Sequence, residues 1–529
     1  MKASFPLYPG YVRRPRAHVL ALDDGACLIL PSTGEILQPT SYAEWLTFAL
    51  DNKLDVRVDS IIGWRFFDDV LKDEHAHILA ARSRLDLHPK AVSIRWRVGN
   101  QYCTLFPASQ WGDSATLESL KTHQATLDYL NVGVYASPSS LGQATMARAM
   151  VDQTGKLKGY NVPNRNCAKD LRDNLVGGRI ETYQPGVYPD ITEIDRNSAY
   201  VDEAAGFLPC GKAIDLYAPG LTEANEYAHY YAQCVVFIHI NLSLGPFPFR
   251  DATTGNVSYP TEPGTYENVW LWKGEIQDSI QAGCQVVIRK AWAWSKSEPA
   301  LRSWAEWMYD KRGPDAPNEH VRSYIKRLAL AAIGWHGMAP AHLRVVPWSE
   351  DNEDTTPIVN QNGFPTGFVA VAELEKQPRQ LTHWASYIYA QARRTLYRRE
   401  LDEIESGNRL VTCDTDSLKL AYPTKLATSQ TMLGAWKSRT LTNVRQSIGR
   451  GYYCDQKMVA PGVSGEDSRE RWTRTLHLWL EERQEKDALD ALQKANHPAE
   501  WALDRLRDLK DWEPAMGWAP PVRKKRGED

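Results

Sequence analysis

Two short acidic turns are the residues of this sequence whose types and spacing could do chemistry. The first contains Asp195, which ends the extended segment 190–195 and is followed by a polar turn and Tyr200. The second contains Asp414 and Asp416 and lies between the apolar runs 410–413 and 418–421. Mg²⁺ prefers oxygen ligands and keeps several waters, so a few carboxylates on rigid neighbouring strands can hold it. The two turns together therefore predict a divalent-metal site.

Each turn also has an ordinary structural interpretation. An Asp-rich turn can bond its own backbone through its carboxylates, and Asp195 could equally be the N-cap of a helix. The turns are far apart in the sequence, so only tertiary structure could bring them together. If they meet, two bound ions would suit nucleotidyl transfer. One ion would lower the pKa of an attacking 3′-hydroxyl, and the other would hold the triphosphate and the leaving pyrophosphate.

The elements that must position these acids follow from the apolar pattern. Strands are expected at 17–22 and 27–30, where they form a hairpin, within 91–106, and at 234–240, 285–291, 410–413 and 418–421. Helices are expected at 42–50, 66–84, 301–310, 321–333 and 383–405. The fold class is therefore α/β (α+β). A stretch rich in Ser, Gly, Asn and Asp at 136–180 predicts a domain boundary.

Composition narrows the class of protein. A chain of 529 residues with 43% hydrophobic residues is long enough for several domains. A net charge of −3 counts against a wholly basic nucleic-acid binder, but it is compatible with a basic groove beside an acidic metal site. Eight cysteines without a CxxC pair do not suggest a zinc ribbon or a disulfide framework. We expect no signal peptide, no membrane span and a cytoplasmic location.

The acidic turns resemble two motifs of family B DNA polymerases. Residues 195–200 (DRNSAY) resemble motif A, Asp-x-x-Ser-Leu-Tyr-Pro, and residues 412–417 (TCDTDS) resemble motif C, Tyr-x-Asp-Thr-Asp-Ser. Between them, Lys326 and Gly334 resemble the ends of motif B, Lys-x-x-x-Asn-x-x-Tyr-Gly. The order A, B, C is that of the family.

Further matches resemble the protein-primed bacteriophage branch of that family. Residues 176–179 (VGGR) resemble the Tyr-x-Gly-Gly linker that joins its exonuclease and polymerase domains. Residues 433–436 (LGAW), 450–452 (RGY) and 457–462 follow motif C where the branch has elements near the primer terminus. The resemblance covers about residues 175–465, and it implies a bacterial or phage-encoded protein.

The resemblance implies a role for each matching residue. Asp195 and Asp416 would hold two Mg²⁺ ions, for which Mn²⁺ can substitute, and Asp414 would be an auxiliary catalytic acid. Tyr200 would stack under the incoming sugar and exclude a 2′-hydroxyl. The other expected nucleotide contacts are Ser198, Lys311, Arg322 and Lys326, and the expected DNA contacts are Gly177, Gly178, Arg179, Ser417, Arg450, Tyr452 and Lys457. The i, i+4 spacing of Arg322 and Lys326 places them on one helix face, which would equally suit a solvated surface.

The resemblance also implies an architecture. A right-hand polymerase (palm, fingers and thumb) would follow a degenerate RNase H-like exonuclease-type domain at 1–170. Palm and fingers would span 171–465, with inserts at about 213–300 and 345–375, and 466–529 would form a thumb or helical C-terminal region with a basic tail. The first strand of the N-terminal region has Asp23-Asp24 instead of Asp-x-Glu, and Asp68 and Asp128 would be remnants of later exonuclease motifs.

Several positions depart from the family's pattern. Motif B has Leu330 for Asn and Ile333 for Tyr, so Trp335 or His336 would have to supply the lost ring. Thr412 and Val201 replace a Tyr and a Pro, but no departure removes a metal ligand.

We expect a DNA-dependent DNA polymerase that adds deoxynucleotides to a primer 3′ end, with weak or absent proofreading. Its partners would be template-primer DNA and dNTPs, and a priming protein if initiation is protein-primed; primer-independent initiation is also open. The alternatives are an inactive polymerase-like DNA-binding scaffold and a metal-dependent nuclease, for which the N-terminal region offers too few acids.

Overall fold

A computed structural model describes the chain in parts. The described residues are 160–184, 186–253, 255–313, 315–337 and 380–446, together with 126, 129–130, 138–150 and isolated strands within 16–107, 341–374 and 452–459. The expected helices at 42–50 and 66–84, the acids Asp23, Asp24, Asp68 and Asp128, the contact Arg450 and the segment 466–529 lie outside these residues. Helices and strands are both present, which confirms the predicted mixed class.

The chain divides into two compact units, each described by itself. Unit 1 comprises residues 1–173, 204–208 and 298–385, and unit 2 comprises 174–203, 209–297 and 386–529. The division at 173/174 lies close to the expected boundary at 170. Residues 298–385, which fall within the expected palm and fingers, group with unit 1.

The N-terminal part of unit 1 contains a mixed sheet of order β3-β2-β1-β4-β7-β6-β5. Strand β1 pairs antiparallel with β2, as the predicted hairpin requires, and parallel with β4. A second sheet, β18-β20-β19, is antiparallel, and its strands lie largely within 345–375, where an insert was expected. The strand bounds are β1 (Arg16–Leu22), β2 (Gly25–Ile29), β3 (Ile36–Leu37), β4 (Asp55–Val58), β5 (Asp86–Leu87), β6 (Ile94–Val98), β7 (Gln101–Pro107), β18 (Ala341–Pro347), β19 (Thr356–Val359) and β20 (Pro365–Leu374).

Three helices of unit 1 contact one another: α5 (Pro138–Ala149), α10 (Arg302–Arg312) and α11 (Glu319–Gly337). The Trp304 indole of α10 donates to the Thr145 hydroxyl of α5 at 3.0 Å. Helix α11 continues past its predicted end at 333, because its last turn buries His336 against Met146 of α5. These contacts explain why 298–337 groups with the N-terminal part of the chain.

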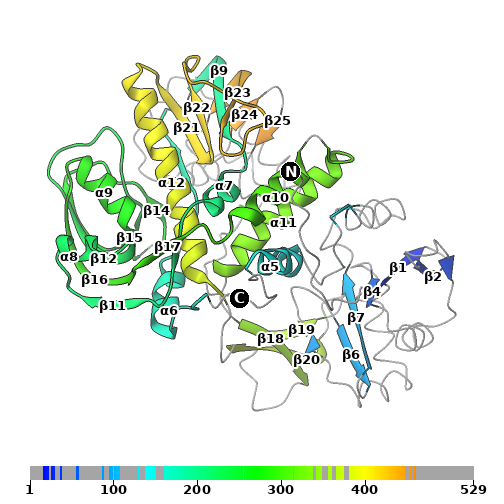
Figure 1. Cartoon of the computed structure of the whole chain (residues 1–529). Helices are drawn as coiled ribbons and strands as arrows, with labels where there is room; N and C mark the ends of the chain where they lie inside the picture. Colours follow the sequence, from blue (N-terminus) through cyan, green and yellow to red (C-terminus); the bar gives the residue numbers. More distant parts are fainter. Residues whose placement is uncertain are drawn as a thin grey trace, which may run out of the picture. The chain divides into compact units, whose positions relative to one another are not determined.

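Unit 2 is built on a second seven-stranded sheet, of order β25-β24-β23-β9-β22-β21-β8, which we call the acid-bearing sheet. Helix α12 (Thr382–Glu405) lies beside it (Figure 1), and Leu396 and Tyr397 of α12 pack on Ile194, Cys413 and Leu418. The helix contains no Gly or Pro, and it ends where Gly407 takes a φ of 83° and donates to the Ile404 carbonyl. The strand bounds are β8 (Arg179–Thr182), β9 (Gly186–Arg196), β21 (Leu410–Thr415), β22 (Ser417–Leu420), β23 (Trp436–Gln446), β24 (Tyr452–Cys454) and β25 (Lys457–Val459).

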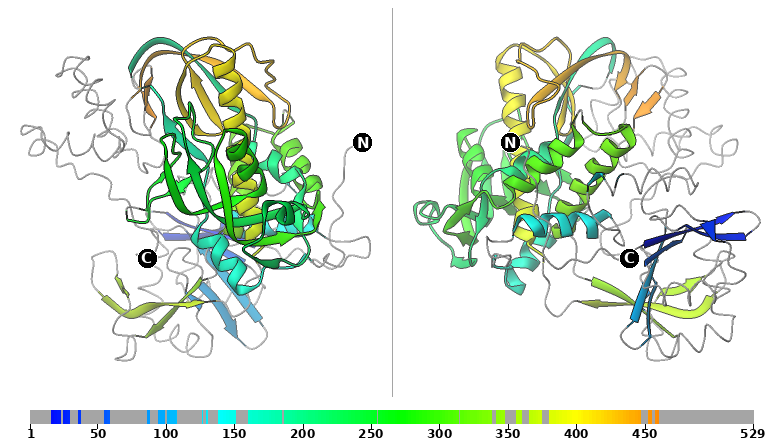
Figure 2. Two further views of the ribbon diagram at one scale, coloured as in Figure 1. Left: turned by 90° about the vertical axis from the view of Figure 1, so that its left-hand side faces the viewer. Right: turned by 45° about the vertical axis from the view of Figure 1, so that its right-hand side comes forward.

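Residues 209–297 of unit 2, which we call the insert, form a four-stranded antiparallel sheet of order β11-β16-β12-β15. Helix α9 covers this sheet (Figures 1 and 2), and its Ile276 joins an apolar core with Cys234, Leu271 and Ile288. The bounds are β11 (Ile214–Tyr217), α8 (Leu221–Asn225), β12 (His229–Ile238), β15 (Gly264–Trp272), α9 (Lys273–Gln281) and β16 (Gln285–Trp294).

The remaining described elements are short: α6 (Arg165–Asp173), α7 (Ala199–Ala205), β10 (Leu208–Cys210), β13 (Phe249–Arg250), β14 (Val257–Ser258) and β17 (Lys296–Glu298). Among the helices that the structure describes, none has the length and apolar character needed to cross a membrane.

Candidate active site

The acid-bearing sheet brings the two acidic turns together. Strand β22 pairs antiparallel with β9, so that Ser417 lies opposite Asp195, and it also pairs with β21, so that Ser417 lies opposite Asp414. The Arg196 amide donates to the Asp416 carbonyl at 2.9 Å, and the Asp416 amide donates to the Asp414 carbonyl at 2.7 Å. Because these bonds join backbone to backbone, the carboxylates are carried rigidly where adjoining strands end. We call this end of the acid-bearing sheet the sheet edge.

Two residues at this edge have strained backbones. Ser198 has a φ of 53° and Thr415 a φ of 64°. Positive φ is uncommon for residues other than glycine, and a β-branched Thr in this region is an outlier. Strain of this kind persists only where the surroundings impose it, and it is frequent at functional sites. Ser198 lies three residues after Asp195, and Thr415 separates Asp414 from Asp416.

The carboxylates of the site are partly accessible to solvent, and a cation lies beside one of them. Asp195, Asp414 and Asp416 are all half-buried. Strand β23 places Lys437 opposite Asp195, and the Lys437 Nζ lies 3.2 Å from the Asp195 Oδ1. Both side chains of this pair are about one-third exposed, at 38% and 34%. Asp195 therefore has a partly exposed cation as its neighbour in this structure.

The donor set fits Mg²⁺ only with help from other ligands. Within the described parts of the chain, no group of three or more His, Cys, Asp and Glu side chains is placed to hold a metal ion. Two carboxylates from adjoining strands remain, and Mg²⁺ characteristically uses one or two protein carboxylates together with waters and substrate phosphates. The residues present therefore fit such an ion when a phosphate-bearing substrate completes its coordination.

A charged ladder continues along the same strand face. Glu193, two residues before Asp195, is buried between Lys419 of β22, at 3.4 Å, and Arg439 of β23. The alternate residue Ile194 points to the other face, where it joins the apolar core under α12. The pleat thus separates the acidic edge from the core that supports it.

Tyr200 lies one helical turn beyond Asp195, near the start of α7. Its ring packs edge-on against Tyr389 of α12, with ring centroids 5.1 Å apart. Burial, and next to it the neighbouring Tyr389, raise the pKa of the phenol above its ordinary value, so the hydroxyl remains protonated. A Cβ on Gly178 would lie 2.8 Å from the Tyr200 hydroxyl and 2.8 Å from the Thr415 methyl. Only glycine fits at this position.

Arg179, expected to contact DNA, is buried with 1% of its surface exposed. Its guanidinium forms ion pairs with Glu181 and with Glu400, the latter at 3.3 Å, and donates to the Gly245 carbonyl at 2.7 Å. It also lies 4.2 Å from the centroid of the Tyr259 ring. The prediction is wrong in this structure, because every side of the cation is used inside unit 2.

The other expected DNA contacts lie in three places. The Ser417 hydroxyl is buried and donates to the Asp414 carbonyl at 3.2 Å, so it supports the acidic turn from within. The Gly177 carbonyl accepts a hydrogen bond from Arg393, and Gly178 packs closely against the Tyr200 hydroxyl. Tyr452 and Lys457 are described as backbone positions in β24 and β25, which extend the acid-bearing sheet beyond β23.

The expected nucleotide contacts from helices α10 and α11 belong to unit 1. Lys326 is exposed, Arg322 donates to the Gly313 carbonyl at 3.4 Å, and the Lys311 ammonium lies 4.5 Å from the centroid of the Tyr129 ring. Helix α11 therefore presents Lys326 on its solvent face. The pairing of Arg322 with Glu319 reduces the positive charge of the helix face that Arg322 and Lys326 were expected to share.

His336 does not supply the ring missing from motif B. Its Nδ1 accepts from the Leu381 amide at 3.0 Å, and its Nε2 lies 3.3 Å from the Met146 sulfur. Burial lowers the pKa of the imidazole to about 4, so the neutral form is held in the core. Trp335 is half-buried and packs edge-on against His336, with centroids 4.9 Å apart.

Sequence reasoning missed three residues that the geometry places at or behind the site. Lys437 follows directly after the LGAW match, and its position opposite Asp195 depends on strand register. Arg393 is one of several arginines on the helix expected at 383–405, and its spacing does not distinguish it from the others. Glu275, which pairs with Arg393, lies in no motif, so no sequence signal could have found it.

Comparisons with protein-family models and with curated proteins find no match. Solved structures do match. A ternary complex of phi29 DNA polymerase with primer-template DNA and incoming nucleotide aligns with a TM-score of 0.64 at 13% identity, over 86% of this chain and 94% of that one. The same polymerase with single-stranded DNA aligns with a TM-score of 0.59 at 13% identity, over 84% and 89%. Its orthorhombic crystal form gives 0.57 at 12% identity, over 86% and 90%. The chain therefore has the fold of phi29 DNA polymerase, in agreement with the family B fold that its motifs predict.

Proposed function

We propose that this chain is a DNA-dependent DNA polymerase that adds deoxynucleotides to a primer 3′ end. One observation carries the proposal: the register of β9, β22 and β21 joins Asp195 to the Asp414–Asp416 turn in a chain with a polymerase fold. A surface turn or a helix N-cap would not require two distant acidic segments to share a sheet edge. Half-buried like charges on such an edge cost stability unless a cation is bound there.

Asp195 and Asp416 would hold two Mg²⁺ ions. Bound there, the ions would acidify the primer 3′-hydroxyl and neutralise the charge that develops on the triphosphate. The strained backbone at Ser198 would present the turn after Asp195 to the phosphates. Asp414, on the same turn as Asp416, would add negative charge that raises the affinity of the edge for cations.

Tyr200 would form the floor under the sugar of the incoming nucleotide. Its ring is held against Tyr389, and Gly178 leaves no free space on the hydroxyl side. A ring fixed on two sides cannot move away from a 2′-hydroxyl, so it would select deoxynucleotides. Three cations of unit 1 would attract the triphosphate electrostatically: the exposed Lys326, Lys311 and Arg322.

The test is a primer-extension assay with the whole chain, Mg²⁺ and dNTPs. Wild-type extension that Asp416→Ala abolishes would support a polymerase, and wild-type DNA binding without extension under any template or metal would support the scaffold alternative. Omitting the primer tests primer-independent initiation. A mismatched 3′ end tests the expected weak or absent proofreading.

A further inference from the structure

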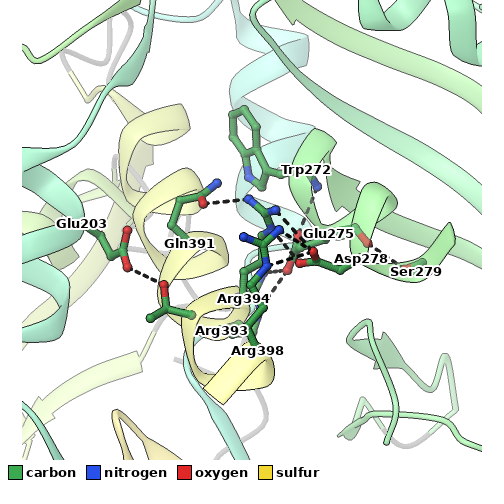
Figure 3. A network of polar contacts seen from close by, with 10 residues as sticks. Glu203, Trp272, Glu275, Asp278, Ser279, Gln391, Arg393, Arg394 and Arg398 are labelled. Atoms are coloured by element: carbon green, nitrogen blue, oxygen red, sulfur yellow. Dashed lines mark hydrogen bonds and ion pairs between the residues drawn. The ribbon is translucent and has the colours of Figure 1, made fainter. Parts of the chain in front are cut away.

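One buried arginine joins its own helix, α12, to two other segments of unit 2. Arg393 of α12 is buried, and its Nε and Nη2 donate to Glu275 Oε1 at 3.0 and 2.6 Å. Its Nη1 donates to the carbonyls of Val176 and Gly177 at 2.5 and 2.8 Å. Figure 3 shows the first of these contacts, with Arg393 reaching from α12 to α9 of the insert.

Glu275 is fixed on its other side as well. Its Oε2 accepts from the Trp272 amide at 3.1 Å, which caps the N-terminus of α9. Its side chain is only 2% exposed, so both oxygens are directed within the fold. A buried carboxylate with these two partners has no freedom to follow Arg393 if the arginine moves.

The two carbonyls lead directly into the tight contact at Gly178. The Cα of Gly178 faces the Tyr200 hydroxyl and the Thr415 methyl so closely that a Cβ would lie 2.8 Å from each. A shift of Val176 and Gly177 by a few tenths of an ångström would therefore be transmitted to Tyr200. It would also reach the turn that separates Asp414 from Asp416.

We propose that Glu275 is a positioning residue for deoxynucleotide selection. It sets the position of Arg393, Arg393 fixes the backbone at Val176 and Gly177, and that backbone closes the space beside Tyr200. This inference rests on the proposed function, and it adds that the insert contributes to sugar selection without contacting the nucleotide. Loss of the carboxylate would free Arg393 to move, which would loosen the wall beside the Tyr200 hydroxyl and admit ribonucleotides.

The same helix offers a matched control. Asp278 lies one turn beyond Glu275, is equally buried, and pairs with Arg394 at 2.7 Å and with Arg398 at 2.8 Å (Figure 3). The hydrogen bonds described for these two arginines go to Asp278 and, from Arg394, to Gln391. Asp278→Asn therefore weakens the attachment of α9 to α12 without touching the Val176–Gly177 carbonyls.

The experiment measures kcat and KM for dNTP and rNTP incorporation by the whole chain, with unfolding midpoints recorded for each variant. We expect Glu275→Gln to lower the dNTP/rNTP selectivity by about 5- to 50-fold, mainly through the two KM values, and Asp278→Asn to change it by less than about twofold. Glu275→Asp keeps the charge and shortens its reach, so it should give a smaller change in the same direction and serves if Glu275→Gln does not fold.

A double mutant distinguishes positioning from general loosening. If Glu275 acts through Tyr200, Glu275→Gln should change selectivity no further in a Tyr200→Ala background. Equal effects of Glu275→Gln and Asp278→Asn, unchanged selectivity in both Glu275 variants, or full additivity with Tyr200→Ala would overturn the inference. If the wild type is active, any of these results would overturn the inference but leave the proposed polymerase function standing. If the wild type is inactive, the proposed function and the inference both fail.

Discussion

Unit 2 contains two sets of carboxylates that differ in what surrounds them. At the sheet edge, Asp195 and Asp416 are half-buried, and the ammonium against Asp195 is itself partly exposed. In the interior, Glu275 and Glu400 are buried and face the guanidiniums of Arg393 and Arg179. A buried acid is tolerated only when the fold supplies its counter-charge. The difference teaches that the interior acids have their counter-charges buried with them, while the edge acids remain partly accessible to solvent.

The largest expected effect is also the most direct test of this difference between the two sets of acids. Asp195→Asn should reduce primer extension by about 10³-fold or more, because a metal ion contributes several kcal/mol of transition-state stabilisation. The free energy of unfolding should change by less than about 1 kcal/mol, since the only described ion pair lost is the partly exposed one with Lys437. Single-turnover extension and thermal unfolding of the same preparation check both halves. A destabilised variant would mean that Asp195 is a structural acid.

The opposite pattern is expected in the interior. Arg179→Ala should destabilise the protein by about 3–5 kcal/mol, because it leaves Glu400 and Glu181 without their buried cation. Arg398→Ala is the control, since its side chain is 55% exposed and its pair with Asp278 is shared with Arg394. It should cost less than about 1 kcal/mol. Chemical denaturation measures both values, and similar losses would contradict the distinction between interior and surface pairs.

A pH prediction extends the comparison to a buried base in unit 1. The His336 pKa is about 4 in the folded chain against 6.5 for a free imidazole, because burial disfavours the charged ring. Between these values the unfolded chain binds more protons, so stability is complete above pH 6.5 and falls as the pH decreases towards 4.

We expect wild type to lose about 2–3 kcal/mol more than His336→Gln between pH 7 and pH 4. Glutamine can still accept from the Leu381 amide but does not titrate. The pKa of His229 is also lowered to about 4 by burial, but His229 is present in both proteins, so the difference isolates His336. Parallel stability curves across this range would contradict the buried neutral ring.

The smallest expected effect concerns the cation at the edge. Lys437→Gln removes an ammonium 3.2 Å from Asp195 Oδ1 and should tighten Mn²⁺ binding by about 2- to 5-fold, as solvent-accessible ion pairs contribute about 0.2–1 kcal/mol. Paramagnetic resonance of free Mn²⁺ measures the affinity without relying on activity. The exposed Lys425 provides the control, since Lys425→Gln should leave binding unchanged. Weaker binding by Lys437→Gln would show that the lysine supports the site instead of competing for it.

Local patterns predicted most of the elements that carry the site. The apolar runs around Asp414 and Asp416 become β21 and β22, and the helix expected at 383–405 is α12. Helix ends were less predictable, as α11 shows, because burial of His336 in unit 1 extends it. Arg179 was misassigned for a related reason. A cation beside a glycine pair looks like a phosphate ligand until the fold surrounds it with Glu181 and Glu400.

By itself, the sequence determined the acids, their order along the chain and the strands that end in them, because these depend on residue type and on spacing within a few positions. Only the tertiary structure decided which residues meet. Lys437 faces Asp195, Glu275 faces Arg393 and Gly178 faces Tyr200 through strand register and helix packing. A shift of one residue in such a register turns a side chain to the opposite face of the sheet. The sequence alone therefore could not distinguish the acids open to a metal ion from those already neutralised within the fold.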